Sequence, residues 1–101
     1  MENKEFSKKL EERTKAFAIR IIKLSIILPT TVEGKIIRNQ LTKAGTSIVA
    51  NYREANRARS RADFNNKMKI CESEASDTKY GIEIIRDMEW VETQKLTPIL
   101  T

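Results

Sequence analysis

The sequence predicts an all-α protein, an antiparallel up-down helical bundle of the four-helix type with three long helices and a truncated fourth. Two observations lead to this prediction. Apolar residues recur every three or four positions through the segments 5–28, 31–56 and 61–87, which is the spacing of one helix face. The 101 residues include only three Gly and two Pro, too little turn material for a sheet protein with many short connections. At this length we expect one domain, 1–101.

The first helix is predicted over residues 5–28. Its apolar stripe is of the coiled-coil type and consists of Leu10, Thr14, Phe17, Ile21, Leu24 and Leu28. The stripe stops before Pro29, because proline disfavours helical geometry in the residue ahead of it. Thr30 and Glu33 then have the spacing of a capping box, in which side chains satisfy free amides at a helix start. The second helix is therefore expected to begin at about residue 31.

The second and third helices are predicted over 31–56 and 61–87. The second stripe consists of Ile37, Leu41, Ala44, Ile48, Tyr52 and Ala55. The third stripe consists of Phe64, Met68, Cys71, Ala75, Thr78, Ile82 and Ile85. Ser60 and Asp63 form a second capping box ahead of the third helix. Short connections make neighbouring helices antiparallel, so the three stripes are expected to face one another in a bundle.

A fourth helix is predicted to begin near residue 97. Thr97 is a plausible N-cap, and Pro98 suits the first helical position because its missing N–H would lack a partner there in any case. Only three residues follow this proline. One groove of the bundle is then expected to lack a cover. Either another subunit fills it, or the chain is shorter than the sequence that shaped it.

Charge is unevenly distributed along the chain. The net charge is +5, but residues 29–70 carry nine Lys and Arg against three Asp and Glu, and residues 71–101 carry three against seven. A basic segment of this kind favours a polyanionic partner such as nucleic acid. The acidic segment could equally be the partner of the basic one, within the chain or between subunits.

The candidate nucleic-acid-binding residues are Arg53, Arg57, Arg59, Arg61, Lys67 and Lys69. The first, second and fourth of these have helical spacing across the end of the second helix. Like charges at this density repel one another, but they become favourable when phosphates lie opposite, since neutralised phosphates release counterions. The alternative is that carboxylates neutralise the cluster, the candidates being Glu54, Asp63, Glu72, Glu74 and Asp77.

Small and polar residues precede the cluster. Gly45 lies inside the second helix, where glycine costs about 1 kcal/mol relative to alanine, so close packing of another helix is the preferred explanation. Asn51 and Glu54 follow one and two turns later and are interpreted as polar core positions that fix register. The residues assigned a structural role are Gly45, Ser47, Asn51, Glu54, Ser60 and Asp63.

No catalytic, metal or cofactor site is predicted. Histidine, the commonest general base and metal ligand, is absent, and the lone Cys71 falls on an apolar stripe. The most apolar stretch, 16–28, contains Arg20 and Lys23 and is too short to span a bilayer. Association of the first helix with a membrane surface is a weaker alternative. We expect a cytoplasmic protein that is not an enzyme.

Residues 40–85 contain a pattern typical of one family. It comprises Gln40-Leu41, Ala44 to Ile48, Ala50-Asn51, Glu54-Ala55, Ser60, Asp63-Phe64, Lys67 and Tyr80. In these positions the chain resembles the four-helix-bundle family of 23S rRNA intervening-sequence proteins, whose relatives include accessory variability proteins of diversity-generating retroelements. The chain departs from the pattern at Gly81, where the family usually has a large apolar residue, and in its nearly missing fourth helix.

The resemblance implies a small non-enzymatic bundle, often a homopentamer shaped as a basic barrel. In the retroelement branch it also implies binding to nucleic acid and to a reverse transcriptase. We therefore expect a self-associating bundle whose basic surface binds RNA or DNA. The alternative is an oligomeric protein–protein adaptor, for example a reverse-transcriptase accessory subunit.

Overall fold

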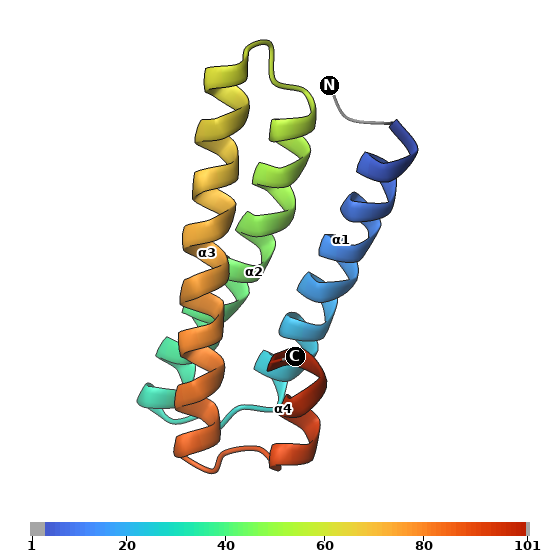
Figure 1. The fold of residues 1–101 in the computed structure, drawn as a ribbon. Helices are drawn as coiled ribbons and strands as arrows, with labels where there is room; N and C mark the ends of the chain where they lie inside the picture. The colour runs from blue at the N-terminus through green and yellow to red at the C-terminus, as the bar shows by residue number, and fades with distance from the viewer. Residues whose placement is uncertain (1–3, 101) are drawn as a thin grey trace.

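The computed structural model describes residues 4–100, and their side chains as far as residue 96. Four helices occur in this part of the chain: α1 (Lys4–Ile26), α2 (Val32–Asn56), α3 (Arg61–Asp87) and α4 (Thr93–Leu100). The three long helices run antiparallel in sequence, α2 packs against both α1 and α3, and α4 packs against α3 (Figure 1). No strand occurs within the described residues. The predicted all-α bundle with three long helices and a short fourth is confirmed.

The turn between α1 and α2 is held by contacts that the sequence did not predict. The N-cap of α2 is Thr31 and not Thr30, because the Thr31 hydroxyl accepts a hydrogen bond from the Gly34 amide at 3.1 Å. Gly34 is required at its position, since a Cβ there would collide with the carbonyl oxygen of Pro29. α1 ends at Ile26, two residues earlier than expected.

Arg38 of α2 closes the end of α1. Its Nε donates to the carbonyl of Ser25 at 3.1 Å and its Nη2 to the carbonyl of Leu28 at 2.9 Å. The Ser25 carbonyl is in the last turn of α1, where backbone oxygens lack i+4 partners within the helix, and the Leu28 carbonyl is in the turn that follows. A side-chain contact also joins the two helices here, because the Thr42 hydroxyl donates to the buried Ser25 hydroxyl at 3.0 Å. Hydrogen bonds from Arg38 and Thr42 of α2 thus hold the α1–α2 turn in place.

The main hydrophobic core lies at the end of the bundle that contains α4. It consists of Ile21, Leu24, Leu28, Leu41, Ile82, Ile85 and Leu96, each at most 5% exposed. Six of these seven residues lie on the predicted stripes, and Leu96 is the contribution of α4. One stripe position differs from the prediction, because Ala75 is exposed.

α3 ends in a Schellman motif that directs the chain into α4. The Glu89 amide donates to the Arg86 carbonyl at 3.0 Å and the Trp90 amide to the Ile85 carbonyl at 3.2 Å, with Glu89 in the left-handed region at φ 56°. Trp90 packs against the core. The fourth helix therefore begins at Thr93, four residues before the predicted start, and Pro98 lies inside it.

At the opposite end of the bundle, the described residues 4–100 form three helices. The α2–α3 loop and the start of α1 lie there, away from α4 (Figure 1). The stripe residues that α1 and α3 contribute at this end, Leu10, Phe64 and Met68, are only half-buried. α4 is too short to reach this end, so their outer sides stay accessible.

Candidate nucleic-acid interface

The α2–α3 loop presents three arginines at one end of the bundle. α2 ends at Asn56, Arg57 is its C-cap residue, and α3 begins with Arg61. Ser60 caps α3 at the position that the capping-box spacing predicts, because its hydroxyl accepts from the Asp63 amide at 3.1 Å. The loop is therefore short and defined at both ends, with Arg59 in its middle. The continuous helical spacing expected across this boundary is interrupted by the turn.

Arg57, Arg59 and Arg61 are exposed. Within residues 4–96, no carboxylate lies within 4 Å of any of the three guanidinium groups. The acidic residues that could have neutralised them, such as Glu54 and Asp63, form no ion pair with them in this part of the chain. The guanidinium groups are also close to the amino-terminal end of α3, where the helix dipole is positive. This end of the molecule is therefore suited to an anion.

Arg53 is in a different situation from the three loop arginines. Its Nε lies 3.7 Å from Oε1 of Glu11, a residue of α1. This ion pair was not predicted from the sequence. The other carboxylate oxygen of Glu11 accepts a hydrogen bond from Asn56 Nδ2 at 2.8 Å. Because Glu11 joins α1 to the end of α2, Arg53 has a local partner and its charge is partly compensated.

Lys67 and Lys69 lie on α3, beyond the loop, and face different sides of that helix. They are two positions apart on α3, which separates their side chains by about 200° around the helix axis. Lys67 is half-buried and Lys69 is exposed. Lys69 also lies eight residues beyond Arg61, roughly 12 Å along the helix. The predicted set is thus divided into a compact group at the loop and two separate lysines.

Two basic residues of α1 were missed. Lys4 and Lys8 border a groove with a cavity volume of about 340 Å³ at the loop end, together with Arg57. The other residues that line the groove are Ser7, Glu11, Ala55, Asn56 and Phe64. Lys4 and Lys8 could have been predicted, because the antiparallel arrangement expected from the short connections brings the start of α1 beside the end of α2. We call Arg57, Arg59, Arg61, Lys4 and Lys8 the basic tip.

The residues assigned a structural role behave differently from one another. A Cβ on the buried Gly45 would lie 3.0 Å from Ile21 Cγ2, so α1 approaches α2 closely at this point. Asn51 is half-buried, and its Nδ2 donates to the carbonyl oxygen and hydroxyl of Ser47 at 2.9 and 3.0 Å. Glu54 is exposed, which corrects the interpretation of this residue as a buried polar group.

No alternative chemistry emerges in the described part of the chain. Burial raises the pKa of the Cys71 thiol, which lies 3.6 Å from the carbonyl oxygen of Ile48, so the unreactive protonated form is favoured. Among the described residues, no group of three or more acidic or cysteine side chains is placed to hold a metal ion. Within residues 4–100, no helix is long and apolar enough to cross a bilayer.

Comparisons with known proteins agree with the fold and identify the family. The chain is 36% identical to a protein of unknown function from the S23 ribosomal protein family of Bacteroides thetaiotaomicron VPI-5482, whose crystal structure superposes with a TM-score of 0.82. This similarity covers 89% of the present chain and 83% of the other. Among curated proteins no match was found. The family model of the 23S rRNA-intervening sequence proteins matches residues 7–101. The chain therefore belongs to the family of 23S rRNA-intervening sequence proteins.

Proposed function

We propose that this chain is a non-enzymatic, self-associating protein whose basic tip binds nucleic acid, with structured RNA as the first candidate ligand. The observation that carries this proposal is that Arg57, Arg59 and Arg61 are exposed at one end of the bundle without a carboxylate partner among the described residues. The family name, which refers to 23S rRNA, supports RNA over DNA.

The chemistry of the tip fits phosphate. A guanidinium group donates two parallel hydrogen bonds to phosphate oxygens, which a lysine ammonium cannot do. The lysines of α1 add positive charge on the other side of the groove, so a phosphate backbone that crosses the groove would meet cations on both walls. Glu11, which also lines the groove, has an ion pair with Arg53 and accepts a hydrogen bond from Asn56. Its negative charge is therefore partly compensated and opposes phosphate binding less.

Self-association is supported by the opposite end of the bundle. Four aliphatic side chains around the α1–α2 turn are more than half exposed: Ile26, Ile27, Val32 and Ile36. Grouped aliphatic exposure of this kind is typical of protein interfaces. We propose a homo-oligomer, for which a pentamer is one candidate, in the cytoplasm. The same aliphatic group favours the second candidate function, a protein–protein adaptor such as a reverse-transcriptase accessory subunit related to those of diversity-generating retroelements.

The test is salt-dependent binding to a structured RNA and to a DNA duplex of the same length. Replacing Arg53, Arg57, Arg59 and Arg61 together by glutamine removes four positive charges. We expect most of the affinity to be lost and the slope of log affinity against log salt to fall by about 3, because three of the four arginines lack a carboxylate partner among the described residues and each phosphate contact contributes about 0.9 to that slope.

A matched variant controls for net charge. Arg20, Lys23, Lys35 and Lys79 are all exposed and lie outside the basic tip, so replacing these four by glutamine removes the same charge. If both variants lose affinity equally, binding depends on total charge and the tip is not the site. If neither loses affinity, the nucleic-acid proposal is wrong and the adaptor function becomes the better candidate.

A further inference from the structure

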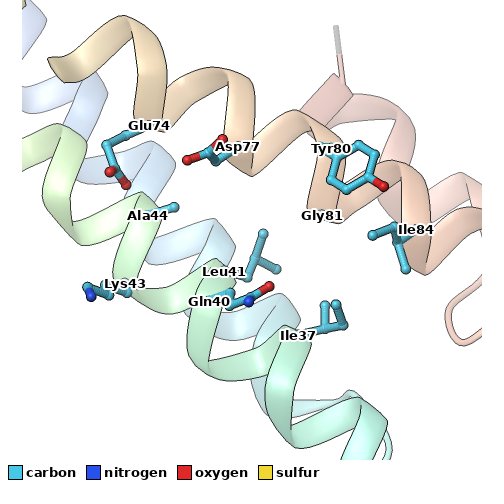
Figure 2. A pocket seen from close by; sticks show the side chains of 10 residues that line it. All are labelled: Ile37, Gln40, Leu41, Lys43, Ala44, Glu74, Asp77, Tyr80, Gly81 and Ile84. Carbon is cyan, nitrogen blue, oxygen red and sulfur yellow. The ribbon is translucent and has the colours of Figure 1, made fainter.

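A second pocket lies between α2 and α3, on the side of Gly81, away from the basic tip. Its cavity volume is about 380 Å³, within the range of ligand pockets. The apolar part of its wall comes from Ile37, Leu41, Ala44 and Ile84, and Figure 2 shows the first two of these side chains directed toward the space beside Gly81. The pocket is therefore a concave surface between α2 and α3 with an apolar part in its wall.

Gly81 keeps this pocket open. The residue is on α3, facing α2, and it has no side chain to occupy the space between the two helices (Figure 2). A Cβ at this position would approach the Leu41 Cδ1 atom to 3.1 Å, so this methyl would have to shift slightly to admit an alanine side chain. Any larger residue would fill the cavity. Glycine in a helix interior costs about 1 kcal/mol relative to alanine, and an open pocket is a specific reason for it.

Polar groups border the apolar wall on one side. Glu74 and Asp77 are three positions apart on α3, so their carboxylates lie on the same face, and Tyr80 follows one turn later. Neither carboxylate has a cationic partner within 4 Å among the described residues. Lys43 also lines the pocket, but its ammonium group is directed away from Gly81 (Figure 2). The amide of Gln40 points toward the centre of the pocket.

We propose that this pocket binds an arginine or lysine side chain presented by a basic peptide segment of a partner protein. The long aliphatic stem of such a side chain would pack on the half-buried Ile37 and Ile84, while its charged head would meet the carboxylates of Glu74 and Asp77. Tyr80, a residue that is 67% exposed at the rim, offers its ring face for a cation–π contact. The ligand's apolar stem and cationic head thus match the apolar and acidic side chains that line the pocket.

Charge complementarity distinguishes this site from the proposed nucleic-acid site. Unpaired carboxylates repel phosphate, so the pocket is unsuited to the ligand of the basic tip. The pocket also lies on the surface between two antiparallel helices, which allows an extended peptide to continue past it along the helix pair. The two sites are at different places on α2 and α3, so both ligands can bind the same molecule.

The experiment measures binding of a fluorescein-labelled peptide of alternating leucine and arginine by fluorescence anisotropy. A peptide with citrulline in place of arginine, which has the same shape without the charge, is the ligand control. The double variant Glu74→Gln, Asp77→Asn removes the carboxylates, and Gly81→Leu fills the cavity. As a matched control, Glu72→Gln with Glu92→Gln removes two exposed carboxylates that do not line the pocket. Circular dichroism checks that each variant is folded.

We expect the arginine peptide to bind the double variant and Gly81→Leu at least tenfold more weakly than wild type, and the control variant within twofold of wild type. Amide resonances of Tyr80 and Gly81 should shift on titration. Equal loss in the control variant, or binding of the citrulline peptide with the same affinity, would overturn the proposal. Displacement of the peptide by agmatine at equal concentration would assign the site to a small cation, and displacement by unlabelled protein would assign it to a second copy.

The same variants separate this proposal from the proposed function. RNA affinity should be unchanged by the double carboxylate variant, and peptide affinity should be unchanged by the four glutamine substitutions at Arg53, Arg57, Arg59 and Arg61. Either binding activity can therefore be absent while the other is present. A loss of peptide binding in the arginine variant would mean that the pocket does not act by itself, and would also overturn the proposal.

Discussion

The two ends of the bundle are built in opposite ways. At the α4 end, six aliphatic side chains from four helices and Leu28 of the α1–α2 turn form a core in which each is at most 5% exposed. At the loop end the described residues form three helices, the apolar stripe residues of α1 and α3 are half-buried, and the contact between α1 and α2 includes the polar Glu11–Asn56 hydrogen bond. The first end contains most of the apolar burial, and the second contains the exposed cations.

This difference shows how a small domain separates stability from binding. A chain of about 100 residues buries a limited fraction of its surface, so it cannot pack both ends equally well. Cations crowded around a tightly packed apolar core would lose hydration, which is costly. Placing the basic tip at the loosely packed end, where guanidinium groups stay solvated, avoids that cost. The comparison predicts that substitutions at the two ends have different consequences.

The largest effect is expected from truncating the core at the α4 end. Ile82 is 1% exposed and contacts side chains from several helices, so Ile82→Ala should lower the free energy of unfolding by about 3 kcal/mol. Met68, which is half-buried near the loop end, should lose only about 1 kcal/mol when replaced by alanine, because part of its surface is already in water. Urea unfolding followed by circular dichroism measures both values.

Equal losses for the two variants would break the comparison, since they would mean that the loop end is as well packed in solution as the α4 end. One arrangement could produce that result, namely a second subunit that covers Met68. Repeating the unfolding at several protein concentrations separates the cases, because stability that depends on a subunit contact rises with concentration.

An intermediate effect is expected from the two helical glycines that face another helix. In Gly45→Ala the new Cβ would meet Cγ2 and Cβ of Ile21 at 3.0 and 3.2 Å, and Ile21 is fully buried and cannot move aside. We expect a net loss of about 1 kcal/mol, from overpacking reduced by the better helix propensity of alanine. In Gly81→Ala the contact is one flexible methyl of Leu41 beside an open pocket, so we expect a gain of about 0.5 kcal/mol.

The opposite signs make this pair a sharp test of where space exists between the helices. Thermal unfolding of both variants beside wild type measures the difference. If Gly45→Ala is stabilising, α1 does not approach α2 as closely as the structure indicates. If Gly81→Ala is strongly destabilising, Leu41 cannot move aside and the space beside Gly81 is smaller than the structure indicates.

The long helices could be predicted from the sequence because one physical signal, the recurrence of apolar residues, determines them. The stripe through Leu41, Ala44 and Ile48 was sufficient to place α2 against its neighbours. Details that depend on one contact in space were not predictable, such as the carbonyls that Arg38 reaches, or Thr31 acting as the cap in place of Thr30. The predicted start of α4 was also wrong. The prediction relied on Thr97-Pro98, whereas the Schellman motif at Glu89 turns the chain early enough for the helix to begin at Thr93.

The candidate site was predictable in part for the same reason. Clustered arginines near residue 57 are visible in the sequence, and the turn that separates them follows from the Ser60 cap. The compensation of Arg53 by Glu11 and the contribution of Lys4 and Lys8 depend on how α1 lies along α2. Lys67 and Lys69 were grouped by sequence distance, although two positions on a helix face different ways.

The smallest effect is expected at Cys71. This buried residue of α3 lies between the two ends of the bundle, so it tests how far the well-packed part extends toward the loop end. Burial raises the pKa of its thiol above the ordinary value of 9.0. The folded state therefore binds the proton more tightly than the unfolded state, so this contribution to stability is complete below about pH 9 and is lost as pH rises through the folded pKa. We expect the stability of wild type to fall more than that of Cys71→Ala between about pH 8 and about pH 10, the difference being under about 1 kcal/mol.

In native protein a thiol reagent should react with Cys71 slowly, at a rate limited by opening of the loop end. Identical pH dependence in the two proteins, together with fast thiol reaction, would show that the well-packed part of the bundle ends before Cys71.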